Sequence, residues 1–429
     1  MVGYTSTGKT KCDFQGENGM EHRKISMFYY RVTKAASYVV SKLIFKRKFL
    51  RNEIKGKKGP FVVIANHEAA LDFVNLIGAT GEHMSFVISN SFYQTLPVGW
   101  IMDKIGVIPK QQFQTTLKDI KQMKQVIEEG GILVLYPAGL MCEDGLSTPI
   151  PEATYKFLQW IKADIYVART TGTYFSMPKW GKGMRRGRTF LDIYKLFSKE
   201  ELLEAELSDV KARTDEALLF DAYREQDKLK IKYRNNGNIE GLENVLYMCP
   251  HCKAEFTMGV KDKSTLFCSA CGYEQTSDKY GMLENKGEIG EEIRYVSDWS
   301  TLIQSELEGK VERGEITELT EEVEVQTVDP KTHKFVTRGE GSVKLTDRYI
   351  YFNATVDGAP VEFELATACF PSVPFKPGKY VELQHGDMIY RCVLKDGKRA
   401  TRFVNLLKIF HRLNVHTHDA ATCGCHAHP

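Results

Sequence analysis

A histidine and an aspartate five positions apart are the residues of this sequence whose types and spacing best suit proton transfer. His67 and Asp72 follow the apolar run at residues 61–65 (FVVIA). Positions five apart on a regular helix point about 140° away from each other, so the two side chains can meet only if His67 lies in a turn between a strand and a helix. A carboxylate that accepts the imidazole N–H fixes the tautomer, and the other ring nitrogen can then take a proton from a hydroxyl. A capping histidine beside a surface aspartate is the alternative.

Four cysteines in two Cys-x2-Cys pairs form a second group that could do chemistry. Cys249 and Cys252 are separated from Cys268 and Cys271 by fifteen residues. Four thiolates on two tight turns match a closed, tetrahedral, structural zinc site. We therefore expect a zinc ribbon over residues 240–283, with Zn²⁺ as a structural cofactor. A redox dithiol or a nucleic-acid contact is the alternative, but the balanced charge and few aromatic residues of this segment argue against nucleic acid.

The elements that must position His67 and Asp72 have an α/β pattern. Short apolar runs bounded by Gly, Pro, Asn or charged residues predict buried strands, and the stretches between them predict helices. The strands are expected at 61–65, 84–89, 132–136 and 164–169, and the helices at 115–129, 152–162 and, as one long charged helix, 199–233. The fold class is thus an α/β domain over residues 25–235, with a mostly parallel sheet and flanking helices.

The segment 27–50 mixes apolar and basic residues at helical spacing. Its apolar residues follow an i, i+4, i+7, i+11, i+15 pattern: Phe28, Val32, Ala35, Val39 and Leu43. Between Glu21 and Pro60 there are twelve Lys/Arg and only two acids. Such a helix suits the surface of an anionic membrane, with its basic residues at headgroup level. A docking helix of a soluble domain is the alternative, and both can hold.

The remaining segments predict a second, mainly β domain and two tails. Six strand-like runs between residue 316 and about residue 390 are broken by Gly-containing turns, and a helix over 398–413 closes the series. This order resembles the pleckstrin-homology (PH) or GRAM superfold, which we expect over 316–413 after a helical linker at 284–315. Its role is a structural, protein-binding or lipid-binding one. Residues 1–24 are expected to be flexible, and the His/Cys-rich tail at 414–429 suits adventitious metal binding.

The sequence also bears on location. No secretory signal is visible, and no apolar stretch approaches the roughly 18 residues that a membrane span needs. Paired cysteines without a signal point to a reducing compartment. We therefore expect a cytoplasmic protein that is peripheral on the cytoplasmic face of the membrane.

Several blocks in a fixed order resemble the glycerophospholipid (1-acylglycerol-3-phosphate) acyltransferase superfamily. The first is His67-x4-Asp72 after a buried strand, and the later ones are Gly106–Lys110, Leu135–Gly139 and the apolar strand from Asp164. The resemblance implies that His67 is the catalytic base with Asp72 behind it, and that Lys110 holds the acceptor's phosphate where the family usually has Arg. It also places Gly139 in the substrate turn. Arg185, Arg186 and Arg188 are further candidates for binding the acceptor.

Two departures from the family pattern fall on the acceptor side. The third block carries Ala138 where the family has Glu, and Leu140–Cys142 stand where Thr-Arg-Ser is usual. Glu143 is a candidate to replace the lost carboxylate.

The resemblance implies an O-acyltransferase of phospholipid biosynthesis. It would move a fatty acyl group from a thioester donor, acyl-CoA or acyl carrier protein, directly to the hydroxyl of a lysophospholipid or glycerophosphate-type acceptor. The acyl chain is expected in an apolar groove between the N-terminal helix and the sheet, and backbone amides near Gly139 are expected to stabilise the oxyanion. Ala138 keeps open a catalytically degenerate lipid-binding scaffold. The basic segment and the cysteines keep open a nucleic-acid-binding zinc-ribbon protein, although no nucleic acid is expected as a partner.

Overall fold

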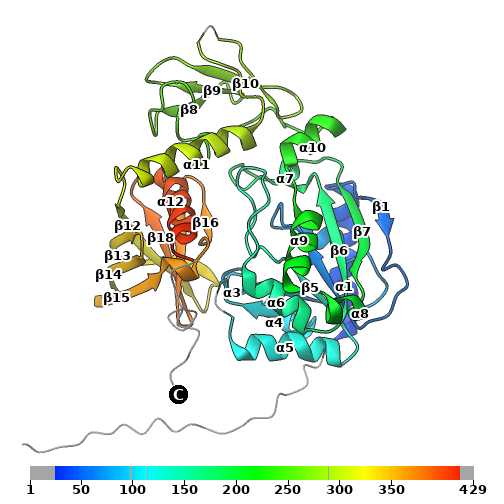
Figure 1. The fold of residues 1–429 in the computed structure, drawn as a ribbon. Helices are drawn as coiled ribbons and strands as arrows, with labels where there is room; N and C mark the ends of the chain where they lie inside the picture. The colour runs from blue at the N-terminus through cyan, green and yellow to red at the C-terminus, as the bar shows by residue number, and fades with distance from the viewer. Residues whose placement is uncertain (1–24, 97–98, 114, 288, 416–429) are drawn as a thin grey trace, which may run out of the picture.

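Three sheets and the helices packed on them make up the protein (Figure 1). The computed structural model describes residues 25–96, 99–113, 115–287 and 289–415. The predictions for residues 1–24 and for most of the tail, residues 416–429, lie outside this part of the chain. Within it, no helix is long and apolar enough to span a bilayer.

The first sheet has seven strands in the order β1-β7-β6-β2-β5-β3-β4. The central strand β2 pairs in parallel with β5 and β6, β3 pairs in parallel with β5 and β4, and β7 runs antiparallel to β6. The predicted α/β domain with a mostly parallel sheet is therefore confirmed. Its strands are β1 (Lys48–Asn52), β2 (Phe61–Ala65), β3 (Met84–Ser89), β4 (Ile108–Lys110), β5 (Ile132–Leu135), β6 (Asp164–Thr171) and β7 (Phe190–Phe197).

Helices cover both faces of this sheet. Successive residues of β2 point to opposite faces, so they pack against different helices. Phe61 and Val63 pack in a cluster with Tyr30 of α1, whereas Val62 and Ile64 pack in another cluster with residues of α5, α6 and α9. The helices of the domain are α1 (Met27–Leu43), α2 (Asp72–Leu76), α3 (Asn90–Gln94), α4 (Gly99–Lys104), α5 (Leu117–Glu128), α6 (Glu152–Trp160), α7 (Thr173–Ser176), α8 (Lys199–Glu204), α9 (Leu207–Leu218) and α10 (Ala222–Leu229).

The predicted long helix over 199–233 is wrong, because the chain forms α8, α9 and α10 there. Ala205 and Leu219, which follow α8 and α9, are both extended, and Asp221 caps α10 by accepting the amides of Tyr223 and Arg224. The N-terminal helix likewise ends at Leu43, since the following residues form β1 and pair with β7. The pattern of charged residues in the sequence did not show where these helices end.

The cysteine segment folds into a small antiparallel sheet in the order β11-β10-β9-β8. Its strands are β8 (Met258–Lys261), β9 (Thr265–Cys268), β10 (Glu274–Ser277) and β11 (Leu283–Glu284), preceded by the 3₁₀ turn η1 (Leu242–Asn244). The helix α11 (Val296–Glu312) follows and buries Trp299, whose indole N–H donates to the carbonyl of Met248 at 2.9 Å. The link between the cysteine segment and the last domain is therefore rigidly packed.

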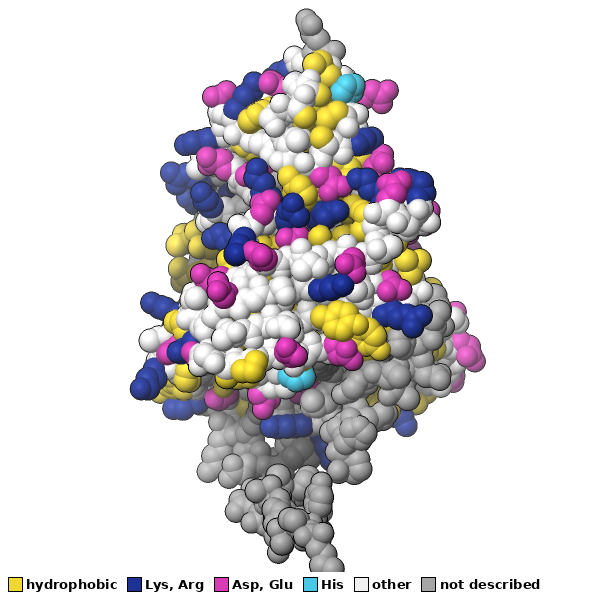
Figure 2. Space-filling model, turned by 90° about the vertical axis from the view of Figure 1, so that its left-hand side faces the viewer, with side chains coloured by type: hydrophobic (Ala, Val, Ile, Leu, Met, Phe, Trp, Pro, Cys, Tyr) yellow, Lys and Arg dark blue, Asp and Glu magenta, His cyan; other side chains and the backbone are white. Residues whose placement is uncertain are grey.

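The last domain is a seven-stranded antiparallel sheet in the order β15-β14-β13-β12-β18-β17-β16 with one closing helix. Its elements are β12 (Glu318–Asp329), β13 (Lys334–Thr346), β14 (Tyr349–Val356), β15 (Ala359–Ala366), η2 (Thr367–Cys369), β16 (Phe375–Lys376), β17 (Tyr380–His385), β18 (Met388–Leu394) and α12 (Arg399–Asn414). The strands-then-helix order agrees with the sequence, and the likeness to PH or GRAM domains stays a prediction. Figure 2 shows acidic and basic side chains interspersed over one face of the molecule.

One apolar cluster connects the three parts. It runs from Cys142 and Tyr174 in the α/β domain through Leu266 in the small sheet to Phe403 and Phe410 of α12. Thr401 of α12 also donates to the carbonyl of Asn244, before the first cysteine pair. The last helix therefore belongs to the same packed interior as the residues that follow β5.

Candidate active site

His67 lies in the turn between β2 and α2 and contacts Asp72, the first residue of α2. Its Nδ1 is 2.9 Å from Oδ2 of Asp72. The same oxygen accepts the backbone N–H groups of Glu68 at 2.8 Å and of Ala69 at 2.9 Å, and the carboxylate is 1% exposed. Because Nδ1–H donates to a fixed, buried carboxylate, Nε2 is the ring nitrogen that can accept a proton. The imidazole is 20% exposed and so can meet a substrate.

Tyr136 lies against His67, and sequence reasoning missed it. The two ring centroids are 4.5 Å apart, and the buried hydroxyl of Tyr136 has no hydrogen-bond partner among the described residues. Burial, and then the charge of Asp72, raises the pKa of Tyr136 well above its usual value, so the phenol stays neutral. Its position in the third block, directly before Pro137, was the signal that could have identified it.

Glu68, beside His67, is a second ionisable group that sequence reasoning missed. It is fully buried, and its Oε2 accepts the hydroxyl of Thr173 and the backbone N–H of Tyr174, each at 2.9 Å. Burial, and then the charges of Asp72 and Glu225, raises the pKa of Glu68 to about 8. The side chain ties the turn after β6 to the turn that carries His67.

The turn after β5 also touches the His67 turn. Gly139 adopts a φ of 69°, its N–H donates to the carbonyl of Tyr136 at 2.9 Å, and its own carbonyl accepts the amide of Gln112. The backbone N–H of Cys142 donates to the carbonyl of His67 at 3.4 Å. Because the Gly139 N–H is used within the turn, that amide is not free for an oxyanion in this conformation.

The predicted phosphate-binding residues do not gather at one point. Lys110 ends β4 at the same edge of the sheet as His67 but three strands away, roughly 14 Å at the usual strand spacing. Arg185 is buried and donates to the side chain of Asn236 at 3.3 Å and to the carbonyl of Asn238 at 2.6 Å.

Arg186 and Arg188 are exposed on the segment that leads into β7. Gly187, between them, donates to the carbonyl of Ile44 at 3.1 Å, just after α1. The two arginines therefore lie near the C-terminal end of the amphipathic helix.

Glu143 is placed differently from the expected acceptor carboxylate. It is 5% exposed, and its carboxylate lies 2.5 Å from the ammonium of Lys408 in α12 and 3.8 Å from that of Lys179. Burial opposes ionisation, but the charges of Lys408 and Lys179 outweigh it and lower the pKa of Glu143. In this arrangement Glu143 holds two parts of the protein together.

A pocket of about 330 Å³ opens at His67. Asn66, His67 and Ala138, residues 147–150, and α9 with the residues just after it all contribute to its lining. Its size falls in the range of small-ligand sites.

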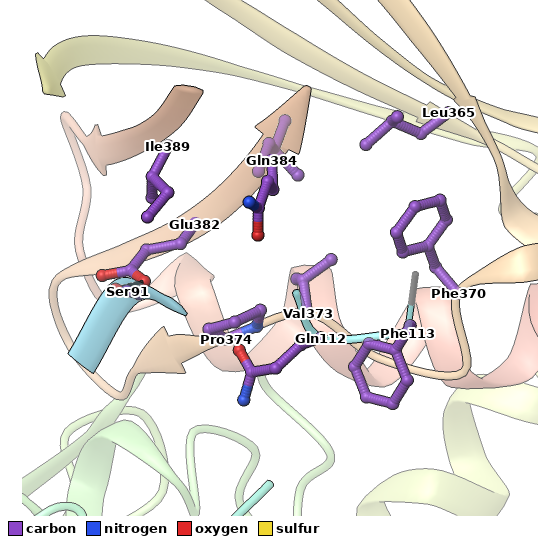
Figure 3. Close-up of a pocket in the computed structure, with 11 residues that line it drawn as sticks. Ser91, Gln112, Phe113, Leu365, Phe370, Val373, Pro374, Glu382, Gln384 and Ile389 are labelled. Carbon is purple, nitrogen blue, oxygen red and sulfur yellow. Dashed lines mark hydrogen bonds between the residues drawn. The ribbon is translucent and has the colours of Figure 1, made fainter. Parts of the chain in front are cut away.

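A second cavity lies between the segment around Phe113 and the C-terminal sheet (Figure 3). Gln384 points into it, and its Nε2 has no hydrogen-bond partner among the described residues. The space, about 20 Å³, admits little more than one water molecule. This cavity is therefore too small for an organic ligand.

The four cysteines come together as their spacing predicts. Their sulfur atoms all lie within 4.8 Å of one another, with Cys249 to Cys271 at 3.7 Å and Cys252 to Cys268 at 3.8 Å. A tetrahedral site with zinc–sulfur bonds of about 2.3 Å has sulfur–sulfur edges of about 3.8 Å. The four thiols therefore fit a Zn²⁺ ion.

The family match lies within the α/β domain. Residues 46–183 match the family model described as acyltransferase, and the matched segment contains His67, Asp72, Lys110 and Gly139. No curated protein matches the sequence. Among solved structures, the chain is similar to the crystal structure of the 1-acyl-sn-glycerophosphate (LPA) acyltransferase PlsC from Thermotoga maritima. The TM-score is 0.38, and the sequences are 17% identical over 47% of this chain and 78% of that one.

Proposed function

We propose that the protein transfers a fatty acyl group from a thioester to the hydroxyl of a lysophospholipid or glycerophosphate-type acceptor. One observation carries the proposal: within the segment that matches the acyltransferase family, a buried carboxylate fixes the partly exposed His67 at a pocket. Such a pair supplies a general base without a serine or cysteine nucleophile, because the acceptor's own hydroxyl attacks the thioester.

The proposed reaction is a single direct transfer. Nε2 of His67 takes the proton of the acceptor hydroxyl as its oxygen attacks the thioester carbonyl. Asp72, which accepts Nδ1–H at 2.9 Å, stabilises the imidazolium that forms. The carbon–sulfur bond then breaks, the thiol leaves with the proton from His67, and the new ester stays on the acceptor. Acyl-CoA or acyl carrier protein would supply the thioester, and Lys110, at the same sheet edge, is the proposed phosphate contact.

We further propose that α1 holds the protein on an anionic membrane surface at the cytoplasmic face. The helix packs on the domain through Tyr30, Ser37 and Ser41 and leaves its predicted apolar stripe uncovered. Phe28 is 70% exposed and Val39 is 52% exposed, although the helix belongs to a folded domain. Uncovered apolar residues of this kind, interspersed with basic ones, are typical of helices that lie in a lipid interface.

A structural Zn²⁺ ion held by Cys249, Cys252, Cys268 and Cys271 completes the proposal. Bound there, it would stabilise the small sheet and supply no catalytic chemistry, since four protein ligands fill its coordination. Lys253 and Lys261 of this segment pair with Glu306 at 2.8 Å and with Glu274. These ion pairs favour a structural role over a grip on nucleic acid.

Thiol release from an acyl-CoA, with and without a lysophospholipid, tests the proposal. Direct transfer predicts release only when the acceptor is present, and Asp72→Asn should lower kcat by about 10²-fold with little change in KM. Release at the same rate without an acceptor would overturn direct transfer. No release from the wild type with any donor or acceptor would favour the catalytically degenerate scaffold, the alternative that Ala138 suggests.

A further inference from the structure

We propose that the pocket at His67 binds the fatty chain of a substrate, and that the acceptor's phosphate stays outside it. This inference rests on the proposed function. It adds the place where the fatty chain binds and the residues that determine which chain lengths are accepted. Its basis is the composition of the pocket wall, the way its charged residues are paired, and the face of the sheet on which it opens.

Most of the wall is apolar. The turn after β5, the segment leading to α6, and the end of α9 with the residues after it all contribute to the wall. The larger apolar lining residues are Leu140, Pro149, Ile150, Leu218, Leu219 and Phe220. Leu140, Leu218 and Phe220 are each less than 8% exposed, so the inner wall is part of the packed domain. A preformed apolar slot of this kind binds a hydrocarbon chain by removing its surface from water.

The lining offers a phosphate no free cation. Apart from His67, its ionisable charges are Lys211 and Asp215, whose side chains pair with each other at 2.6 Å. Tyr155 donates its hydroxyl to the same carboxylate. Both charged side chains are about half exposed, so this pair lies at the outer rim of the pocket.

An acceptor phosphate carries close to two negative charges, and burying it without a cation is strongly unfavourable. The buried carboxylate of Asp72 next to His67 adds to that cost. The acceptor's headgroup therefore remains outside the pocket, at the end of the sheet where Lys110 lies. The fatty chain, which carries no charge, can enter the pocket.

The pocket opens on the face of the sheet opposite α1. Tyr155 and Leu218, which line it, belong to the cluster with Val62 and Ile64, whereas Tyr30 of α1 packs with Phe61 and Val63. We expected the acyl chain in a groove between the N-terminal helix and the sheet, and this proposal places it instead in the pocket beside α9. Residues 207–220, which form this wall, lie beyond the residues that match the acyltransferase family. Chain selection is thus a property of the C-terminal half of the α/β domain.

Two exposed leucines provide a matched test. Leu219 lines the pocket and is 63% exposed, whereas Leu203 of α8 is 56% exposed and does not line it. The experiment compares Leu219→Trp with Leu203→Trp in the full-length protein and measures kcat/KM for acyl-CoA donors from octanoyl to stearoyl. A second series holds the donor constant and varies the chain of the lysophospholipid. Thr148→Trp narrows the pocket from a different segment of its lining and guards against a folding defect of one variant.

We expect each pocket tryptophan to keep about two methylenes of the longest chains from being buried. At about fourfold per methylene, kcat/KM for these chains should fall roughly 15-fold. The shortest chains and Leu203→Trp should keep wild-type values. A shift in the donor series assigns the pocket to the acyl group, and a shift in the lysophospholipid series assigns it to the acceptor's chain. Wild-type length preference in both Leu219→Trp and Thr148→Trp would overturn the inference while leaving the transferase intact. A wild type that transfers nothing would instead refute the proposed function.

Discussion

Lys408, in the last helix of the chain, lies 2.5 Å from the carboxylate of Glu143, which is 265 residues earlier. Glu143 follows directly on Cys142, whose backbone N–H donates to the carbonyl of His67. Asp144, the next residue, accepts the hydroxyl of Ser300 in α11 at 2.6 Å. The C-terminal helices therefore hold the segment that contacts the turn carrying His67, and the last domain supports the structure around His67.

Removing the charge of Lys408 should destabilise the protein. Lys408→Met leaves the buried Glu143 with Lys179 alone, at 3.8 Å, and we expect the free energy of unfolding to fall by about 3 kcal/mol. The matched control is Lys395→Met, whose partner Glu322 is 67% exposed, and its effect on stability should be small because water screens this pair.

Urea unfolding of the two variants, and of Lys408→Met combined with Glu143→Gln, measures these effects. The double variant should lose less stability than the sum of the two single variants, because each single variant already loses the contact between Lys408 and Glu143. Equal losses of unfolding free energy in Lys408→Met and Lys395→Met would contradict the structural role of the Lys408–Glu143 pair.

The buried Glu68 should make stability fall as the pH rises. Its pKa is raised from 4.5 to about 8, by burial first and then by the charges of Asp72 and Glu225. The stability that the neutral carboxyl provides is complete below about pH 4.5 and is lost as the pH rises through about 8.

Glu68→Gln keeps the neutral shape, so its advantage over the wild type in unfolding free energy should grow across that range, by about 1 kcal/mol or more. Chemical denaturation at several pH values, with the exposed Glu364→Gln as control, measures the difference. If the unfolding free energies of wild type and Glu68→Gln changed in parallel with pH, Glu68 would be ionised in the folded protein across this pH range.

The sulfur geometry predicts one zinc ion per chain. Cys268→Ser should abolish metal binding and lower the thermal unfolding temperature, because the small sheet packs into the common core through Leu266. Cys392→Ser changes a buried cysteine outside the cluster and should keep full zinc content. Elemental analysis of the purified proteins measures the zinc content per chain. Metal-free wild type with an unchanged unfolding temperature after chelation would argue against a structural zinc site.

Charging the exposed stripe of α1 should weaken membrane binding. Val39→Asp places a carboxylate in the proposed lipid interface, and we expect at least a tenfold loss of affinity for vesicles of phosphatidylglycerol and phosphatidylcholine. Leu229→Asp, on α10, alters a residue that is 45% exposed and should bind like wild type. Vesicle sedimentation at low and high salt measures both effects. Equal binding of Val39→Asp and wild type would exclude α1 as the contact.

The sequence predicted those parts of the site that depend on neighbours in the chain. The strand before His67 and the helix that starts at Asp72 follow from local apolar patterning, and two short Cys-x2-Cys spacings brought four sulfurs together. The mostly parallel sheet followed from alternating strands and helices.

Features that depend on distant partners could not be predicted. Glu143 and Arg185 were predicted to bind the acceptor because their structural partners, Lys408 and Asn236, lie far away in the sequence. The pocket at His67 was not predicted, since its apolar residues near the end of α9 lie outside the recognised blocks. Glu68 was missed because only the fold shows that its buried carboxyl joins the turn after β6 to the turn that carries His67.

The central claim, that His67 drives acyl transfer, is tested most directly by detecting the ester product. Isotopically labelled palmitoyl-CoA and a lysophosphatidate are incubated with wild type, His67→Ala and His385→Ala, the last being an exposed histidine in the C-terminal sheet. Mass spectrometry then measures labelled acyl chains on the acceptor. We predict that wild type and His385→Ala form the ester at equal rates and that His67→Ala is slower by at least about 10²-fold. Ester formation by His67→Ala at the wild-type rate would contradict the account.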